Sequence, residues 1–255
     1  MRPLSPILSL LIFLAAPVAG AHFLVLTPLS DAVVAGSNPA ISLDIAFTHP
    51  MAGGPVMEMD TPVQFGVVAG GTKADLRASL TERKLSGKRA YRAAFTVEQP
   101  GAHVFHIESA PYYDPSERTT IIQYAKVVVE AFGSDEGWDA LVGFPVEVKP
   151  LVRPYGLWTG NVFQGVVLKD GRPVPSVDVE VEYLNEDAKV KVPSSSFETQ
   201  IIRTDATGTF TYGLPRAGWW GFAALIAGEK QLAPDGKESE LELGALIWVH
   251  ARDME

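Results

Sequence analysis

Cysteine is absent from all 255 residues of this chain. That absence excludes a disulfide framework, a thiolate zinc site, an iron–sulfur cluster and a cysteine nucleophile. It also excludes a lipid-anchored cysteine behind an export signal. Any metal ion held by side chains must therefore rely on histidine, methionine or carboxylate groups.

Basic residues are also few. The chain has 21 Lys and Arg against 30 Asp and Glu, which gives a formal net charge of -9. Nucleic-acid binding needs clustered basic residues, so we expect no nucleic-acid partner. An acidic chain remains compatible with cations. Beyond residues 1–21 no apolar run reaches the about 20 residues that span a bilayer, so we expect no membrane span in the mature chain.

The N-terminus has the residue order of a secretory signal peptide. Arg2 precedes an apolar core over Ile7–Ala16, and small residues follow in Ala19-Gly20-Ala21. This order predicts a signal peptide over residues 1–21 with cleavage after Ala21; cleavage after Gly20 is the alternative. The mature protein is therefore expected in the periplasm.

Apolar and polar residues alternate with a period of two along most of the remaining chain, which is typical of β-strands. The helical periodicity is weak, and Ala74–Arg83 is the one short helical candidate. The sequence therefore predicts an all-β protein. The clearest alternating segments are Ile41–Phe47, Tyr91–Val97, Thr120–Val129, Val177–Tyr183 and Trp219–Ile226.

Prolines at Pro145, Pro150 and Pro154 mark a change in character, because proline is excluded from central strands and helix interiors. We predict two β-sandwich domains, over residues 22–149 and 150–255, of which the first is the candidate metal-binding domain. The second unit contains short strands separated by turns such as Lys169-Asp170-Gly171. Over Asn161–Ala227 it resembles transthyretin-like or carboxypeptidase-regulatory-like modules, which implies a sandwich fold and no particular chemistry.

The predicted cleavage gives the strongest chemical feature, because it would make His22 the first residue. A terminal histidine offers its α-amine and its ring Nδ1 together, and the pair can chelate one metal ion. The alternative is that a histidine follows the signal by accident. Cleavage after Gly20 would present an amine, an amide and an imidazole instead.

His49 lies at the end of a strand, in the segment Phe47–Met59 that also holds all the methionines except Met1 and Met254. Imidazole suits nickel, copper and zinc, whereas thioethers favour softer ions. For His49 a ligand role and a structural role are equally compatible with the sequence. For the methionines we favour packing against the sheet edge.

His103 and His106 are separated by an odd spacing, which in a strand sends their side chains to opposite faces. They are therefore not expected to share a metal ion. His106 and Glu108 do share a face and could ligate together, although a surface histidine is the more common explanation for each of the two histidines. His250 is expected to be structural or exposed.

Catalytic patterns are scarce, and we predict no catalytic residues and no enzyme. No G-x-S-x-G elbow, H-E-x-x-H helix or P-loop is present. The spacing of Asp178, Glu180 and Glu182 puts three carboxylates on one strand face, which we interpret as a solvated outer face. Aromatic clusters beside Pro and Gly, such as Gly218–Phe222, are interpreted as packing rather than as a sugar platform.

Several segments together resemble the NikK-like exported proteins, a family with a domain of unknown function that accompanies nickel and cobalt transporters of the energy-coupling-factor type. The resemblance implies periplasmic delivery of a divalent transition metal to membrane transporter subunits, with His22 and His49 as ligands. It also implies a histidine where this chain has Gln123. The matching segments are Ala21–Phe23, Phe47–Met59, Gln123–Gly133, Gly137–Gly143, Pro150–Phe163 and Pro215–Ala224.

We therefore expect a periplasmic metal-binding protein that holds nickel or cobalt through His22 and His49, with His106 or Glu108 completing the site. Copper would bind more tightly than nickel by the Irving–Williams order. One alternative is a copper-dependent oxidative enzyme with an N-terminal histidine brace, although the pattern shows no clear second brace histidine with an axial tyrosine. Another is an exported interaction module without catalytic activity.

Overall fold

Short strands with alternating burial account for most of the chain in the computed structural model, which describes residues 22–255. The predicted signal peptide and its cleavage site lie outside these residues. Within the described part, the helical elements are two short 3-10 turns, η1 (Arg77–Ser79) and η2 (Ser195–Phe197). No helix among residues 22–255 is long and apolar enough to cross a membrane.

A four-stranded antiparallel sheet forms the first layer, with the order β1-β3-β7-β6. In its inner strand β3, apolar residues alternate with polar ones, and Leu43 and Ile45 are fully buried. Its strands are β1 (Phe23–Pro28), β3 (Ala40–Thr48), β7 (Lys88–Thr96) and β6 (Leu80–Leu85).

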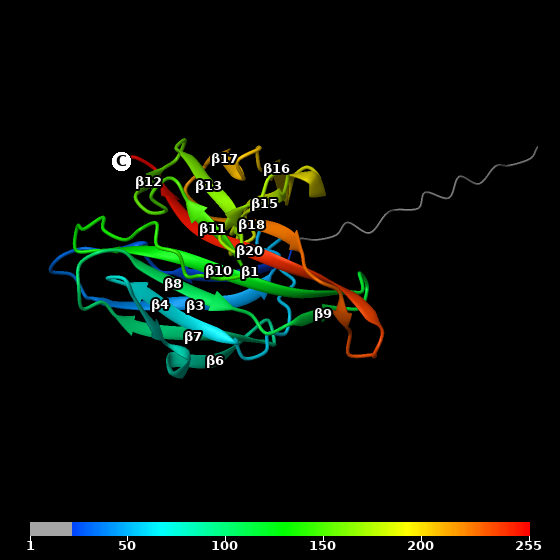
Figure 1. The fold of residues 1–255 in the computed structure, drawn as a ribbon. Coiled ribbons are helices and arrows are strands. Elements are labelled where there is room, and N and C mark those ends of the chain that lie inside the picture. Colours follow the sequence, from blue (N-terminus) through cyan, green and yellow to red (C-terminus); the bar gives the residue numbers. More distant parts are fainter. Residues whose placement is uncertain (1–21) are drawn as a thin grey trace, which may run out of the picture.

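A large mixed sheet forms the middle layer (Figure 1), in the order β16-β15-β18-β20-β10-β8-β4-β5. Its main strands are β16 (Gln200–Arg203), β15 (Asp178–Tyr183), β18 (Gly218–Ala227), β20 (Glu238–Arg252), β10 (Thr119–Ala131), β8 (His103–Glu108), β4 (Gln64–Ala69) and β5 (Thr72–Asp75). Four short strands pair at its margins: β2 (Ala32–Val33), β9 (Tyr112–Asp114), β12 (Leu157–Trp158) and β19 (Gln231–Leu232).

A third, smaller sheet covers the other face of the middle sheet. Pro150 ends its edge strand β11, as expected for a residue that lacks a backbone N–H. The strands are β11 (Val146–Pro150), β13 (Val162–Lys169), β14 (Arg172–Pro173) and β17 (Thr209–Gly213).

Two hydrophobic cores separate the three layers. The core between the first and middle sheets includes Phe23, Phe105 and Trp248, and the core between the middle and third sheets includes Phe163 and Phe222. Burial of such large apolar side chains is the main stabilising contribution in a sandwich. The predicted all-β sandwich fold is confirmed.

The predicted domain boundary at residues 149 and 150 falls inside β11. Strands from both sides of it meet in the middle sheet, where β10 pairs in parallel with β20 over nine residue pairs, from Thr119 with Glu240 to Val127 with Trp248. The two parts of the chain therefore share one sheet and both cores.

The predicted helix over Ala74–Arg83 is wrong. This segment contains the end of β5, the turn η1 and the start of β6. The reason is the tight turn that follows it: Ser86 and Gly87 both have positive φ, of 49° and 80°, and fold β6 back onto β7. Two-residue turns of this kind match the twist of a hairpin and so favour strands on either side.

Candidate functional site

Two of the predicted ligands come together at the start of the first sheet. β1 pairs with β3 so that Phe23 lies opposite Thr48. The flanking residues His22 and His49 therefore meet at the same end of this strand pair, with their ring centroids 4.7 Å apart. Strand pairing thus places two imidazoles side by side where the described chain begins.

Gln123 holds the residue that carries the first imidazole. Its side-chain amide donates to the backbone carbonyl of His22 at 2.5 Å and accepts from the N–H of Leu24 at 2.6 Å. Gln123 is 1% exposed and extends from β10 over Gly244, where a Cβ would lie only 3.0 Å from its Cγ. The absence of a side chain at residue 244 therefore gives this clamp its space.

Three further side chains surround the imidazole of His22. Asp114 places a carboxylate oxygen 3.8 Å from its Nε2, and the rings of Tyr112 and Phe47 lie 5.8 and 5.6 Å from its ring. Tyr112 and Asp114 belong to β9, which pairs with β10 next to Gln123. Sequence reasoning missed Asp114, because a strand of three residues has no readable alternation.

Electrostatics keeps both imidazoles in the form that can bind a metal. Burial lowers the pKa of His22, while the nearby carboxylate of Asp114 raises it by a smaller amount. Burial and the neighbouring His22 lower the pKa of His49, against a smaller opposing effect of Glu198. Both rings are therefore neutral at pH 7, and each offers a nitrogen lone pair.

Acidic side chains lie on the same face of the middle sheet, in continuation of this site. Glu180 on β15 lies opposite Ala223 on β18, and Ala223 belongs to the core between the first and middle sheets. By the alternation of side chains along each strand, Glu182 and Glu242 lie on the same face of the sheet. The interpretation of Asp178, Glu180 and Glu182 as a solvated face holds for Asp178, whose side chain is 46% exposed, but is wrong for Glu182, which is 2% exposed. Its carboxylate accepts from the backbone N–H of Met51 and from Thr199.

The other two predicted ligands, His106 and Glu108, lie on the opposite face of the middle sheet. His106 packs edge-on against Phe144, next to the third sheet, whereas the neighbouring Phe105 and Ile107 face the first sheet. Glu108 accepts a hydrogen bond from the Gln64 amide at 2.6 Å. The structure therefore does not bring either residue to the pair formed by His22 and His49.

The remaining histidines are separate from the pair. His103 and His106 face opposite sides of β8, as predicted, but both are buried, so the surface interpretation of them is wrong. His103 contacts the carbonyl of Gly101 through Nδ1 at 3.1 Å. The ring of His250 lies tilted against that of Trp219, with centroids 4.8 Å apart, and its Nδ1 is 3.7 Å from a carboxylate oxygen of Asp31.

The side chains of Met51 and Met59 are buried, and Met57 packs against the same core as Met59. This confirms the packing role of the methionines. Within residues 22–255, no group of three or more His, Asp and Glu side chains is close enough to hold a metal ion. The pair of His22 and His49 would therefore need another donor to complete a site.

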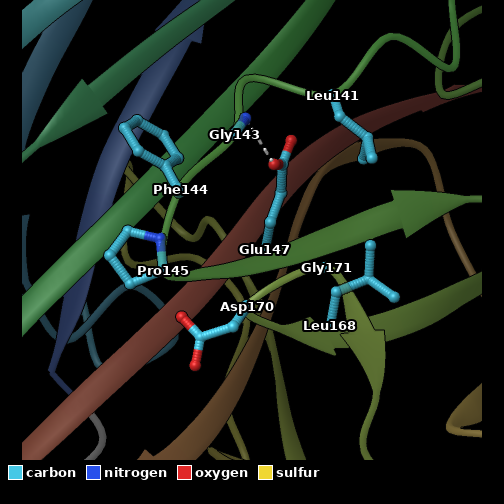
Figure 2. Close-up of a pocket in the computed structure, with 8 residues that line it drawn as sticks. All are labelled: Leu141, Gly143, Phe144, Pro145, Glu147, Leu168, Asp170 and Gly171. Atoms are coloured by element: carbon cyan, nitrogen blue, oxygen red, sulfur yellow. Dashed lines mark hydrogen bonds between the residues drawn. The ribbon is translucent and has the colours of Figure 1, made fainter.

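A cavity of about 300 Å³ lies elsewhere, where the loop before β11 meets the end of β13, and Glu147 lines it (Figure 2). The carboxylate of Glu147 is already engaged: it accepts from Lys126 at 2.7 Å and from the backbone N–H groups of Val142 and Gly143. A carboxylate with three donors has little capacity left for a ligand. We assign this cluster a structural role.

Comparison with known proteins gives a family. The chain belongs to the family described as "Domain of unknown function (DUF4198)", which matches residues 19–228. No curated protein matches the chain.

Among solved structures, the chain is similar to latent PorU from Porphyromonas gingivalis, at 11% identity and a TM-score of 0.26, over 94% of this chain and 21% of PorU. For trypsin-activated alpha-2-macroglobulin from Escherichia coli the identity is 10% and the TM-score 0.27, over 90% and 16% of the two chains. For the fibronectin(III)-like modules of Clostridium thermocellum CbhA the identity is 13% and the TM-score 0.22, over 89% of this chain and 94% of the CbhA chain. The chain thus spans about a fifth or less of the first two proteins.

Proposed function

We propose that this DUF4198 member binds a divalent transition metal ion, nickel or cobalt, through His22 and His49 and delivers it to a membrane transporter in the periplasm. The observation that carries the proposal is the pair of neutral imidazoles, 4.7 Å apart between ring centroids, at the start of β1. Neutral imidazole is a preferred ligand of nickel, copper and zinc.

A third donor would come from the backbone. Removal of residues 1–21 would free the α-amine of His22, on the residue that Gln123 clamps through its carbonyl. The amine, the ring of His22 and the ring of His49 would then supply three nitrogen donors. Asp114, with an oxygen 3.8 Å from Nε2 of His22, would orient that ring from the second coordination sphere.

Carboxylates beside the two imidazoles support the handling of a cation. Asp114 acts electrostatically on His22 and Glu198 on His49, in a chain whose net charge is -9. Such a field raises the local concentration of cations and speeds their arrival. His49 also borders a cavity of about 280 Å³ that reaches Arg83 and Glu186, which gives an ion a route to the pair.

Nickel titration of four forms of the protein, with one control variant, tests this proposal. The chain that starts at His22 is compared by calorimetry with His22→Ala and His49→Ala variants, and with the same chain carrying one extra residue before His22. We expect each change to weaken binding by more than the roughly 10- to 100-fold that loss of an outer-sphere partner costs. His250→Ala, which alters a histidine on Trp219, is the matched control and should leave the affinity unchanged.

The outcomes separate the parts of the proposal. Unchanged affinity in the His22→Ala variant would remove the terminal chelate, and unchanged affinity with the extra residue would remove the amine alone. Binding that is lost in His250→Ala as well would point to general destabilisation instead of loss of a ligand.

Gln123 gives a second prediction, because it touches the site only through the backbone. A Gln123→Leu variant should bind nickel about 10- to 100-fold more weakly, since the residue that carries the amine and the first ring loses its anchor. Gln164→Leu removes a side-chain amide bonded to Thr211 on the third sheet and serves as the control. If both variants bind as the unaltered protein does, the clamp does not position the site.

A copper-dependent oxidative enzyme is the second candidate, and one observation favours it. The structure brings His49 and Tyr112 to His22, so a second histidine and a tyrosine are present beside the predicted terminus. Oxidation of a polysaccharide by the copper-loaded protein with peroxide would support this function. Nickel binding without such activity would support delivery.

A further inference from the structure

His106 is a buried imidazole without a partner, on the sheet face that the metal proposal does not use. It is 2% exposed, and neither Nδ1 nor Nε2 has a hydrogen-bond partner among the described residues. An unsatisfied buried polar group costs about 1–3 kcal/mol, so its retention in a well-packed core asks for an explanation. The explanation we pursue is a ligand.

The local structure directs the ring of His106 towards a cavity. Its neighbour across the strands is Gly66, where a Cβ would lie 2.9 Å from Cε1 and Nε2 of the ring. Because residue 66 has no side chain, the imidazole lies across β4 and reaches the wall of a cavity of about 350 Å³. The His106 ring also packs edge-on against the ring of Phe144.

The charges around this cavity favour an anion. Lys73 lines it, donates two weak hydrogen bonds at 3.5 Å, to the side-chain oxygen of Gln64 and the carbonyl of Val142, and lies over the ring of Phe144. No carboxylate in the described part of the chain pairs with Lys73. Asp75, the acid that lines this cavity, accepts from Arg77 with contacts of 2.7 to 3.1 Å.

The same charges disfavour a metal ion at His106. Burial, and after it the positive charge of Lys73, lower the pKa of this histidine to about 4. The ring is therefore neutral at pH 7 and carries one N–H donor. Among the charges that act on the ring, Lys126 is paired with Glu147 and Asp75 with Arg77. Lys73 would therefore repel a cation bound to the ring and attract an anion.

We propose that the cavity between β4, β5 and His106 binds a small organic carboxylate, held by Lys73 Nζ and the N–H of His106. Val63, Phe65 and Ala74 contribute apolar surface to the lining, beside the polar residues Gln64, Asp75 and Arg77, and this surface can contact the hydrocarbon body of such a ligand. Solvent does not reach the ring nitrogens, so the exposed side chain of Lys73 moves aside to admit the carboxylate.

Nuclear magnetic resonance of the ring nitrogens tests the proposal on the chain of residues 22–255. Butyrate and benzoate should shift the His106 signals saturably, with a Kd of about 1 mM or below for a single-ion site. Lys73→Met should weaken this binding about tenfold or more, the loss expected for one charge-assisted hydrogen bond. Lys230→Met is the matched control, because Lys230 is an exposed lysine just before β19 that pairs with Glu238 and Glu240 of β20.

Three results would overturn the proposal. The first is that neither carboxylate shifts the His106 signals saturably up to about 10 mM. The second is that Lys73→Met binds the carboxylates with the same affinity as the unaltered protein. The third is that Ni²⁺ shifts the His106 signals and the carboxylates do not. If inorganic phosphate binds as tightly as benzoate, the cavity does not select organic carboxylates and binds oxyanions in general. Because Lys73 is exposed, its variant is expected to fold, and the test does not depend on altering His106 itself.

Discussion

A Glu147→Gln variant is expected to lose about 3–5 kcal/mol of unfolding free energy, the cost of breaking a buried ion pair by removing one partner. The pair is deeply buried: Lys126 is 1% exposed and Glu147 is 4% exposed. Burial already lowers the pKa of Lys126, which shows how little solvent stabilises its charge. Without the carboxylate, that charge keeps no counter-ion at hydrogen-bond distance.

The amide of the variant also fits its surroundings poorly. One oxygen of Glu147 accepts from both Lys126 and Val142, and the other accepts from the N–H of Gly143 at 3.0 Å. A glutamine side chain would place an NH₂ group at one of these positions, where it faces another donor. Loss of Lys126 leaves the two backbone donors in place, so Lys126→Met should destabilise the protein less than Glu147→Gln.

Equilibrium unfolding in urea measures these effects. The double variant Lys126→Met with Glu147→Gln should recover most of the loss, because it removes the uncompensated charge. Lys230→Met, which breaks an exposed pair with Glu238 and Glu240, is the control and should change stability little. A Glu147→Gln variant as stable as the control would contradict the structural role assigned to this pair.

The free energy of unfolding is expected to fall as the pH rises from 6.5 to 8. Burial, then the charges of Glu242 and Glu182, raise the pKa of Glu180 to about 8, from 4.5 in the unfolded chain. Above pH 4.5 the folded state holds a proton that the unfolded state has lost. This contribution is complete below pH 4.5 and is lost as the pH rises through about 8, at up to about 1.4 kcal/mol per pH unit.

The histidines make the free energy of unfolding depend on pH in the opposite direction, and they do so in a lower pH range. The pKa values of His22, His49 and His106 are lowered from 6.5, so their contribution to stability is lost as the pH falls below 6.5. Above that value they are neutral in both states. The window from pH 6.5 to 8 therefore isolates the carboxyl groups, with Glu182, at a pKa of about 7, contributing in its lower part.

Glu180→Gln should flatten this slope, because the amide has no proton to lose. Urea unfolding at several pH values across the window measures the slope in the variant, in the unaltered protein and in Glu98→Gln, an exposed control. An unchanged slope in Glu180→Gln would show that another group titrates in this range.

Local patterns predicted the type of structure well but not what covers each face. Alternation correctly placed His103 and His106 on opposite sides of one strand, and it put Glu180 and Glu182 on a common face. The solvated interpretation failed for Glu182 because Met51, 131 positions away in the sequence, and Thr199 contact its carboxylate. Alternation gives the two sides of a strand and cannot say which side another layer covers.

The candidate site shows the same division. The residues His22 and His49 could be chosen from the sequence, as a predicted terminus and as a histidine at a strand end. Their proximity depends on the register of β1 with β3, and the clamp by Gln123 on a contact between residues about a hundred positions apart. The sequence could not show that His106 lies away from the pair formed by His22 and His49. The alternation of side chains along a strand does not tell which face of the middle sheet packs against which layer.

The position of β20 has a consequence for the order of assembly. This strand, Glu238–Arg252, is the last in the chain, yet it lies between β18 and β10 and joins the earlier strands into one sheet. It also lies beyond residue 228, where the family match ends. The edges of β10 and β18 that face β20 stay unpaired until β20 is available. Such late, long-range closure is intrinsically slow, and open strand edges invite pairing between chains. The timing of β20 thus sets the period during which these two edges can pair with another chain.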